Sequence, residues 1–146
     1  MNVKVKVTKL FEASRLPTYA TAGAGAMDLY ACISRPLKIL PGQTELIPTG
    51  IAVELPDSYG LLITPRSGLA IKHNIVVLNT PGLVDDDYRG EIKVVLKNVG
   101  SDVFYINPDA RIAQAFVLPL PKVTWIEVNS LTATQRGTGA FGHTGL

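Results

Sequence analysis

The chain has 146 residues, 47% of them hydrophobic and 18% charged, which fits one soluble domain that buries its own core. Its 14 Lys and Arg residues are scattered and the formal net charge is only +2, which excludes the basic stripe typical of proteins that bind polymeric nucleic acid. No apolar stretch reaches the ~18 residues of a membrane helix, and no signal-peptide pattern is present, so we expect no membrane partner. Cys32 is the only cysteine, which favours a reducing, cytoplasmic location and a buried, inert thiol.

The chain consists of short runs of alternating apolar and polar residues, divided by frequent proline and glycine residues that are typical of turns. The first run alternates Val3, Val5 and Val7 with lysines, the period-two pattern of a strand with one buried face. Ten prolines and 13 glycines then divide the chain into segments too short for long helices. The pattern predicts strands over residues 3–8, 27–31, 44–47, 51–54, 59–64, 75–78, 91–98, 111–118 and 124–128.

One segment has a helical pattern. Residues 67–72 predict one or two helical turns, with Ser67 as the residue that caps the first turn. Many short strands and one short helix indicate an all-β sandwich, barrel or jelly roll. Residues 129–146 are small, polar and glycine-rich and cannot build a core, so we expect a β domain over residues 1–128 followed by a flexible C-terminal arm.

Two glycine-containing segments have the chemistry of phosphate binding. Residues 137–142 match the pattern G-x-G-x-x-G, but only four residues follow, too few for the helix of a dinucleotide-binding unit. Glycines still let a backbone approach phosphate oxygens closely, and Arg136 would add charge. Arg66, Ser67 and Gly68 offer a cation, a hydroxyl and an unhindered amide at the start of the predicted helix, although this tripeptide is also common in ordinary turns.

Polar residues beside apolar runs are the other candidates for chemistry. Residues 85–87 are three aspartates in a turn or hairpin, where one carboxylate would serve as a general base or contact hydrated Mg²⁺; the spacing does not choose among them. Asp28 follows two glycines, and Arg111 and Gln114 interrupt an apolar strand, so these groups need partners. Cys32 and the two histidines lie far apart and no P-loop pattern is present, which excludes zinc and P-loop chemistry.

In chain order, these segments resemble the five motifs of the trimeric dUTPase (deoxyuridine triphosphatase) family, and the resemblance spans nearly all 146 residues. The first two are AGAGAMDL at 22–29 and PRSGLA at 65–70. The other three are NTPGLVDDDYRG at 79–90, RIAQ at 111–114 and RGTGAFGHTG at 136–145. The resemblance implies a distorted jelly-roll or β-clip barrel, a homotrimer with shared active sites, and Mg²⁺-dependent hydrolysis of dUTP to dUMP and pyrophosphate.

The resemblance also implies a role for each site residue. Asp85 would activate the attacking water, and Tyr88 would pack on deoxyribose and exclude a ribose 2′-hydroxyl. Asp28 would contact Mg²⁺ through water. The remaining contacts fall into three groups: the uracil readers Asn79, Leu83, Val84 and Lys93, the phosphate contacts Arg66, Ser67, Gly68 and Gln114, and the residues Arg136, Phe141 and Gly142 from the arm of a neighbouring subunit.

Three residues depart from the family pattern. Asn74, Ala140 and His143 stand where the family commonly has Gly, Gly and Ser. Asparagine tolerates left-handed backbone angles, so Asn74 fits the pattern. Ala140 and His143 alter the details of arm closure and leave the implied reaction unchanged.

Two alternatives remain beside the hydrolase. The first is a dCTP deaminase of the same fold, including one that also hydrolyses dUTP. The second is a non-catalytic β trimer that binds nucleotide for regulation, or a capsid-like structural domain. The spacing of Asp85, Tyr88 and Gly90 together with the arm favours the hydrolase over both.

Overall fold

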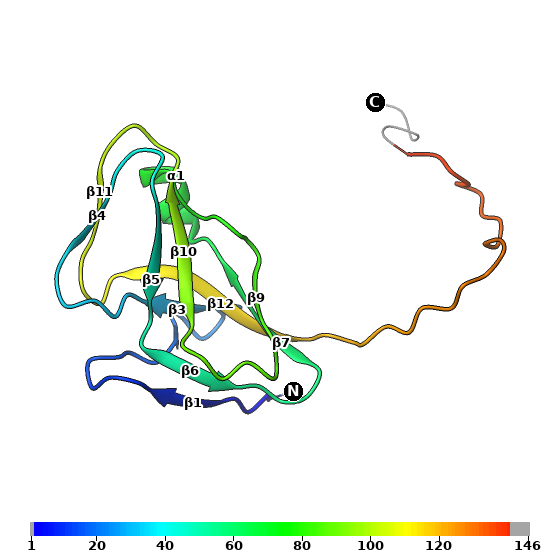
Figure 1. The fold of residues 1–146 in the computed structure, drawn as a ribbon, viewed down its shortest axis with the longest axis horizontal. Coiled ribbons are helices and arrows are strands. Elements are labelled where there is room, and N and C mark those ends of the chain that lie inside the picture. Colours follow the sequence, from blue (N-terminus) through cyan, green and yellow to red (C-terminus); the bar gives the residue numbers. More distant parts are fainter. Residues whose placement is uncertain (1, 141–146) are drawn as a thin grey trace.

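The computed structural model describes residues 2–140, which form an antiparallel β structure with one short helix (Figure 1). The strands are β1 (Lys6–Lys9), β2 (Thr18–Tyr19), β3 (Met27–Tyr30), β4 (Leu37–Ile39), β5 (Thr44–Pro48), β6 (Ile51–Glu54), β7 (Tyr59–Thr64), β8 (Ile75–Val77), β9 (Gly82–Val84), β10 (Lys93–Asn98), β11 (Phe104–Ile106) and β12 (Arg111–Pro119), and the helix is α1 (Ser67–His73). Within these residues, no helix is long and apolar enough to cross a membrane.

The strands pair antiparallel in four sheets. The largest has the order β2-β3-β12-β7-β9, so β12 lies at its centre between β3 and β7. A second sheet has the order β5-β10-β8, and the pairs β1-β6 and β11-β4 form two smaller sheets. Figure 1 shows β5 and β10 running across the direction of β12, so that different sheets contribute to a common core.

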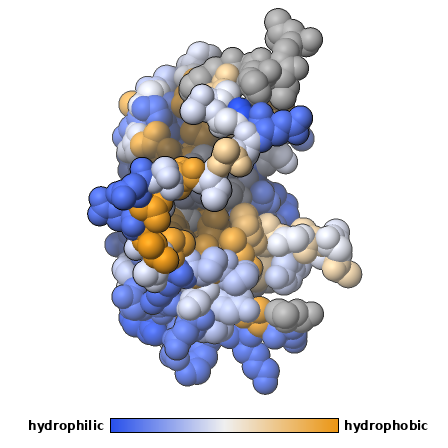
Figure 2. Space-filling model, turned by 90° about the vertical axis from the view of Figure 1, so that its right-hand side faces the viewer, coloured by the Kyte–Doolittle hydropathy of each residue, from blue (hydrophilic) through white to orange (hydrophobic). Residues whose placement is uncertain are grey.

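Beyond β12 the chain leaves the body as a long extension (Figure 1). Figure 2 looks onto this side of the molecule, where hydrophobic residues gather in the middle of the face. The predicted strand at 124–128 is wrong, because these residues take part in no sheet of the described chain. Trp125 and Ile126 are 91% and 81% exposed, so the apolar residues that predicted a strand pack against nothing in the described part of the chain.

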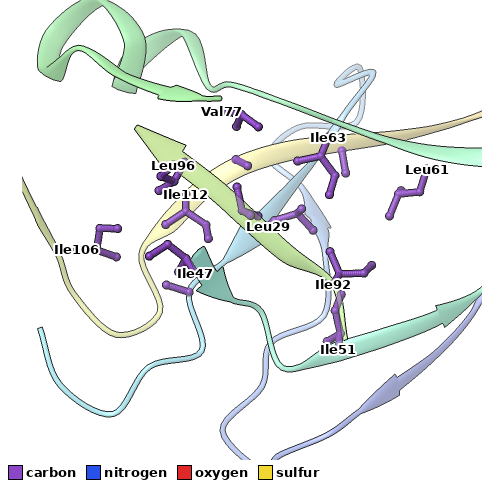
Figure 3. Close-up of a cluster of buried hydrophobic side chains, with 14 of the residues drawn as sticks. Leu29, Ile47, Ile51, Leu61, Ile63, Val77, Ile92, Leu96, Ile106 and Ile112 are labelled. Carbon is purple, nitrogen blue, oxygen red and sulfur yellow. The ribbon is translucent and has the colours of Figure 1, made fainter. Parts of the chain in front are cut away.

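Aliphatic side chains from all four sheets fill the core. Figure 3 shows Leu29, Ile47, Leu96 and Ile112 converging from four different strands, and each is at most 2% exposed. In β10 every second residue is buried, which is the expected consequence of the pleat. Each large aliphatic side chain buried in this way contributes about 1.5–3 kcal/mol.

Alternation predicted most of the longer strands. The predictions at 51–54 and 59–64 coincide with β6 and β7, and five others agree within two residues at each end. β1 begins at Lys6, three residues later than predicted, and its four residues are exposed because it pairs only with β6. The strands β2, β4, β9 and β11 were not predicted, since two or three residues are too few to show a period.

The helix agrees with its predicted place but not with its predicted cap. Arg66, in an extended conformation, is the N-cap, and no side chain caps the first turn, so the capping role predicted for Ser67 is wrong. Ser67 lies inside the helix because the Arg66 carbonyl already accepts the first helical hydrogen bonds. At the other end Asn74 has a φ of 54°, which confirms the expected left-handed angle.

Gly50 occupies a position that has no room for a side chain. Its φ is +68°, and a Cβ there would overlap Oγ of Ser14 and lie 2.7 Å from Sγ of Cys32. Gly42 has a φ of +76° but no atom within 4 Å of such a Cβ, which makes it a matched control. We expect Gly50→Ala to lower the free energy of unfolding by about 3–4 kcal/mol and Gly42→Ala by about 1 kcal/mol. Urea denaturation at one protein concentration measures both losses, and equal losses would contradict the steric explanation.

Candidate active site

A cleft of about 380 Å³ lies between β9, β10 and the turn that joins them. β9 pairs with β7 at the edge of the five-stranded sheet, and the chain then turns back into β10. This hollow, termed the Asp85 cleft, combines an apolar wall with three charged side chains. Its lining residues are Leu46, Leu83, Val84, Asp85, Tyr88, Glu91, Ile92 and Lys93.

Residues 85–87 form a tight turn in which the N–H of Tyr88 donates to the Asp85 carbonyl at 3.3 Å. Asp86 is tied to a neighbouring loop, because its carboxylate accepts the N–H of Ser58 at 2.6 Å. Asp85 is the only one of the three that lines the cleft, and it is exposed to water. The structure therefore shows which of the three aspartates lies in the cleft, a choice that the sequence left open.

Tyr88 forms one wall of the Asp85 cleft. Its hydroxyl donates to the backbone carbonyl of Glu91 at 3.1 Å. Gly90 lies against the ring, and a Cβ at this position would overlap the phenol. The ring position therefore depends on this glycine and on the carbonyl that anchors the hydroxyl.

A second cleft, of about 360 Å³, lies on the β12 side of β7, opposite β9. The antiparallel register places Asp28 of β3 beside Gln114 of β12, and Gln114 beside Thr64 of β7. β7 then leads directly into α1. The residues that line this hollow, termed the Asp28 cleft, are Ala20, Ala24, Gly25, Ala26, Asp28, Arg66, Ser67, Gly68, Arg111 and Gln114.

Two arginines hold the carboxylate of Asp28. Its Oδ1 lies 2.9 Å from Nε of Arg66 in an ion pair, and its Oδ2 accepts Nη1–H of Arg111 at 3.2 Å. The Arg66 guanidinium also donates to the Arg111 carbonyl at 3.1 Å. Because the Asp28 side chain is only 10% exposed, its charge needs these partners. Two cations against one carboxylate leave a net positive charge, which suits an anion.

Four predicted site residues lie outside both clefts or outside the described chain. Asn79 lies just before β9 but does not line the Asp85 cleft. Arg136 lies in the C-terminal extension, where its guanidinium donates to the Gly139 carbonyl at 2.8 Å, and it lines neither cleft. Phe141 and Gly142 lie outside the described residues.

Comparison with known proteins identifies the family. The family model described as dUTPase matches residues 12–145 of the chain. The chain belongs to the dUTPase family. The deoxyuridine 5'-triphosphate nucleotidohydrolase of Chlamydia muridarum is 53% identical over 138 residues, which cover 94% of this chain and 95% of the relative. The enzyme of the same name from Rickettsia felis is 51% identical over 144 residues, which cover 99% and 97%.

Solved dUTPase structures share the fold at low sequence identity. The dUTPase of Staphylococcus bacteriophage 80alpha with dUpNHpp has a TM-score of 0.88 to this structure at 22% identity, over 98% of this chain and 99% of that chain. A dUTPase from phage phi11 of S. aureus has a TM-score of 0.80 at 20% identity, over 89% and 99%. This likeness confirms the predicted jelly-roll β fold of the family.

Two charged residues that line the clefts were not predicted as site residues. Arg111 lines the Asp28 cleft, and its interruption of an apolar strand was a usable signal, since a charged group there needs a partner. Glu91 lines the Asp85 cleft, and its side chain is only 18% exposed. Nothing in the sequence distinguishes Glu91 from the other glutamates, because the turn between β9 and β10 brings it into the cleft.

Gly68 tests whether the Asp28 cleft binds substrate in this dUTPase. A Cβ at Gly68 would meet no atom within 4 Å, so a larger side chain occupies only the space of the cleft. We expect Gly68→Val to change the free energy of unfolding by only about 0.5 kcal/mol and to lower kcat/KM for dUTP at least about tenfold. Lys72→Val, which introduces the same side chain on the same helix but outside this cleft, is the control. Equal kcat/KM in both variants would argue against substrate in the Asp28 cleft.

Proposed function

We propose that this chain hydrolyses dUTP to dUMP and pyrophosphate, with base and sugar in the Asp85 cleft and phosphates in the Asp28 cleft. The dUTP nucleotidohydrolase activity follows from membership of the dUTPase family and from 53% identity over 138 residues to an enzyme of that name. The observation that supports this choice of site is the exposed Asp85 carboxylate in a cleft walled by Tyr88. The reaction keeps dUTP low and supplies dUMP for thymidylate synthesis.

Asp85 is the proposed general base. Its carboxylate takes a proton from a water molecule, whose oxygen forms a bond to the α-phosphorus of dUTP. The bond from this phosphorus to the bridging oxygen breaks, and pyrophosphate leaves with the electron pair. A correctly placed base contributes roughly 10²–10⁴ in rate, or about 3–5 kcal/mol of the barrier.

The other proposed contacts divide between the two clefts. In the Asp85 cleft, the backbone at Leu83, Val84 and Lys93 reads uracil, and the ring of Tyr88 packs on deoxyribose. Asn79, beside the start of β9, completes the uracil contacts. In the Asp28 cleft the phosphate contacts are Arg66, Ser67, Gly68 and Gln114, to which the lining supports adding Arg111.

The proposed assembly is a homotrimer with shared active sites. Among residues 2–140, none lines both clefts, and β7 lies between the clefts in the sheet. Val84, the residue before Asp85, pairs with Leu61 of β7. Gln114 of the Asp28 cleft pairs with Thr64, which lies three residues further along β7. The two clefts are therefore offset by roughly 10 Å along this strand. The Asp28 cleft of one subunit would therefore complete the Asp85 cleft of a neighbour. Exposed apolar residues on the face shown in Figure 2 are the surface that such a contact would cover.

The C-terminal segment is proposed to act on a neighbouring subunit. Residues 129–146 would form an arm over the site, with Arg136 on the γ-phosphate and with Phe141 and Gly142 at the base. The described part supports this role, because Arg136 reaches neither cleft of its own chain. Leu131 is 88% exposed and so has apolar surface available for another subunit.

Mg²⁺ is the proposed cofactor. The solved phage phi11 dUTPase is described with a structural Mg(II) ion, and that statement concerns the phage protein. Among residues 2–140 of this chain, no group of three or more acidic, His or Cys side chains forms a metal site. Phosphate oxygens of dUTP would therefore supply most of the ligands, with Asp28 in contact through water. The bound ion supplies charge that offsets repulsion between the phosphates and the attacking oxygen.

The alternatives from the sequence receive less support. The relatives named above are nucleotidohydrolases, which favours hydrolysis over deamination of dCTP and over a non-catalytic role. The exposed Asp85 also favours an enzyme over a structural β trimer. A cytoplasmic location remains proposed, because Cys32 is the only cysteine of the sequence.

Replacement of the base tests the mechanism. We expect Asp85→Asn to lower kcat by roughly 10²–10⁴ and still to bind a nonhydrolysable dUTP analogue, because the amide keeps the shape but not the basicity. Pyrophosphate release measures turnover, and calorimetry with dUpNHpp measures binding. Turnover equal to that of the unmodified chain would remove Asp85 from this role.

Subunit mixing tests the shared site. Asp85→Asn and Arg66→Ala each disable one cleft, so every mixed trimer regains one intact site when the two clefts come from neighbouring chains. Equal coexpression should therefore restore about a quarter of the normal activity per trimer. Coexpression of Asp85→Asn with Asp85→Ala is the control and should restore none. Absence of recovery in the first mixture, with mixed trimers verified by mass, would place both clefts of a site in one chain.

A further inference from the structure

Glu91 makes three contacts that join the Asp85 cleft to the rest of the protein. Its Oε1 accepts the N–H of Gly50 at 2.9 Å, and its Oε2 lies 3.5 Å from Nζ of Lys93. Its backbone carbonyl accepts the hydroxyl of Tyr88 at 3.1 Å. Glu91 also lines the cleft.

The residue after Glu91 is fixed independently. The N–H of Ile92 donates to the Ile51 carbonyl at 2.9 Å. The Ile92 carbonyl accepts two hydrogen bonds from Thr49, one from its backbone N–H at 3.2 Å and one from its side-chain hydroxyl at 2.6 Å. Because these bonds do not involve the Glu91 side chain, its removal should leave β10 in place and loosen only the turn that precedes it.

The turn before Glu91 carries the wall of the cleft. Tyr88 has its hydroxyl bonded to the Glu91 carbonyl, and Gly90 leaves the space in which the phenol lies. A shift of the Glu91 backbone therefore moves the acceptor on which the ring position depends. The carboxylate prevents this shift by its bond to Gly50, whose turn conformation, with a φ of +68°, presents the N–H to it.

We propose that Glu91 is a positioning residue for the discrimination between deoxyribose and ribose. Its carboxylate, anchored to the β5–β6 turn at Gly50, holds the carbonyl that fixes Tyr88 against the sugar. This inference rests on the proposed function, in which the Asp85 cleft binds base and sugar. A ribonucleotide differs by one hydroxyl, so a displacement of the ring by about 1 Å is enough to alter its acceptance.

The position of Lys93 follows from the same carboxylate. The Glu91–Lys93 contact, at 3.5 Å, directs a side chain that is 45% exposed at the cleft. At this exposure the ion pair contributes little to stability, so its role lies in orientation. The two functions of Glu91 are separable, because glutamine keeps an oxygen for Gly50 but loses the charge that attracts Lys93.

The experiment compares kcat/KM for dUTP with kcat/KM for UTP in the full-length assembled enzyme. We expect Glu91→Ala to lower the dUTP-to-UTP ratio about tenfold. Glu91→Gln should restore the ratio to within about twofold of the unmodified enzyme, because the amide oxygen still accepts the Gly50 N–H. A purely structural glutamate would lower activity on both nucleotides in proportion and leave the ratio unchanged.

Glu54→Ala is the matched control. Glu54 also carries one ion pair, with Nζ of Lys6 at 2.7 Å, and this hydrogen bond lowers the pKa of its carboxyl. Glu54 lines neither the Asp85 cleft nor the Asp28 cleft. Its removal should leave the nucleotide ratio unchanged, which separates the loss of any glutamate from the loss of Glu91.

A double-mutant cycle tests whether Glu91 acts through Tyr88. Tyr88→Phe removes the hydroxyl without touching Glu91 and should itself lower the ratio, which keeps the proposal testable even where Glu91→Ala does not fold. In the Tyr88→Phe background, Glu91→Ala should change the ratio by less than it does alone. Independent effects of the two substitutions would support separate roles and overturn the proposal.

The results also separate this proposal from the proposed function. A folded, unmodified enzyme that releases no pyrophosphate from dUTP would overturn the proposed function itself. An active enzyme in which Glu91→Ala keeps the normal ratio, or in which Glu91→Gln is as impaired as Glu91→Ala, would overturn only the role of Glu91. A lowered ratio rescued by glutamine and coupled to Tyr88 supports it.

Discussion

The backbone ladder of β12 is the constraint on which the rest of the structure depends. This nine-residue strand pairs with β3 on one side and with β7 on the other, and its register brings Asp28, Gln114 and Thr64 into one row. The same β7 carries β9 on its far edge, so the ladder also places the Asp85 cleft. Both clefts are therefore fixed to one sheet, whose buried aliphatic side chains resist any change of register.

The two clefts differ in how their polar groups are satisfied. In the Asp28 cleft, a nearly buried carboxylate is neutralised by two arginines, and their excess charge remains for an anion. In the Asp85 cleft, the turn places one carboxylate in water while Asp86 is bound to a loop. One cleft thus has an excess of positive charge, and the other has an exposed carboxylate beside an aromatic wall. In the proposed function, hydrolysis of dUTP would therefore need both clefts.

The extension beyond β12 differs from the rest of the described chain in the exposure of its side chains. Residues 121–138 are all exposed, and the residues that the structure describes leave Trp125 and Leu131 uncovered at 91% and 88% exposure. Apolar side chains at this exposure are costly in a free monomer, and contact with another subunit removes the cost. The exposure of this extension supports the proposed arm, because a neighbouring subunit of the proposed trimer would cover its apolar side chains.

The sequence by itself determined the β class, most of the longer strands and the five segments that carry the family motifs. The alternation of apolar and polar residues and the positions of proline and glycine are local properties of the sequence. The spacing of the motifs can likewise be read from the sequence without knowledge of contacts. Tertiary structure decided what depends on pairing and proximity. It formed strands of two or three residues that show no period, left residues 124–128 outside every sheet, and moved the helix cap to Arg66. It also distinguished Asp85 from Asp86 through a hydrogen bond to a distant loop, and brought Glu91 against Gly50, because contacts between residues far apart in the chain are fixed only when the sheets pack together.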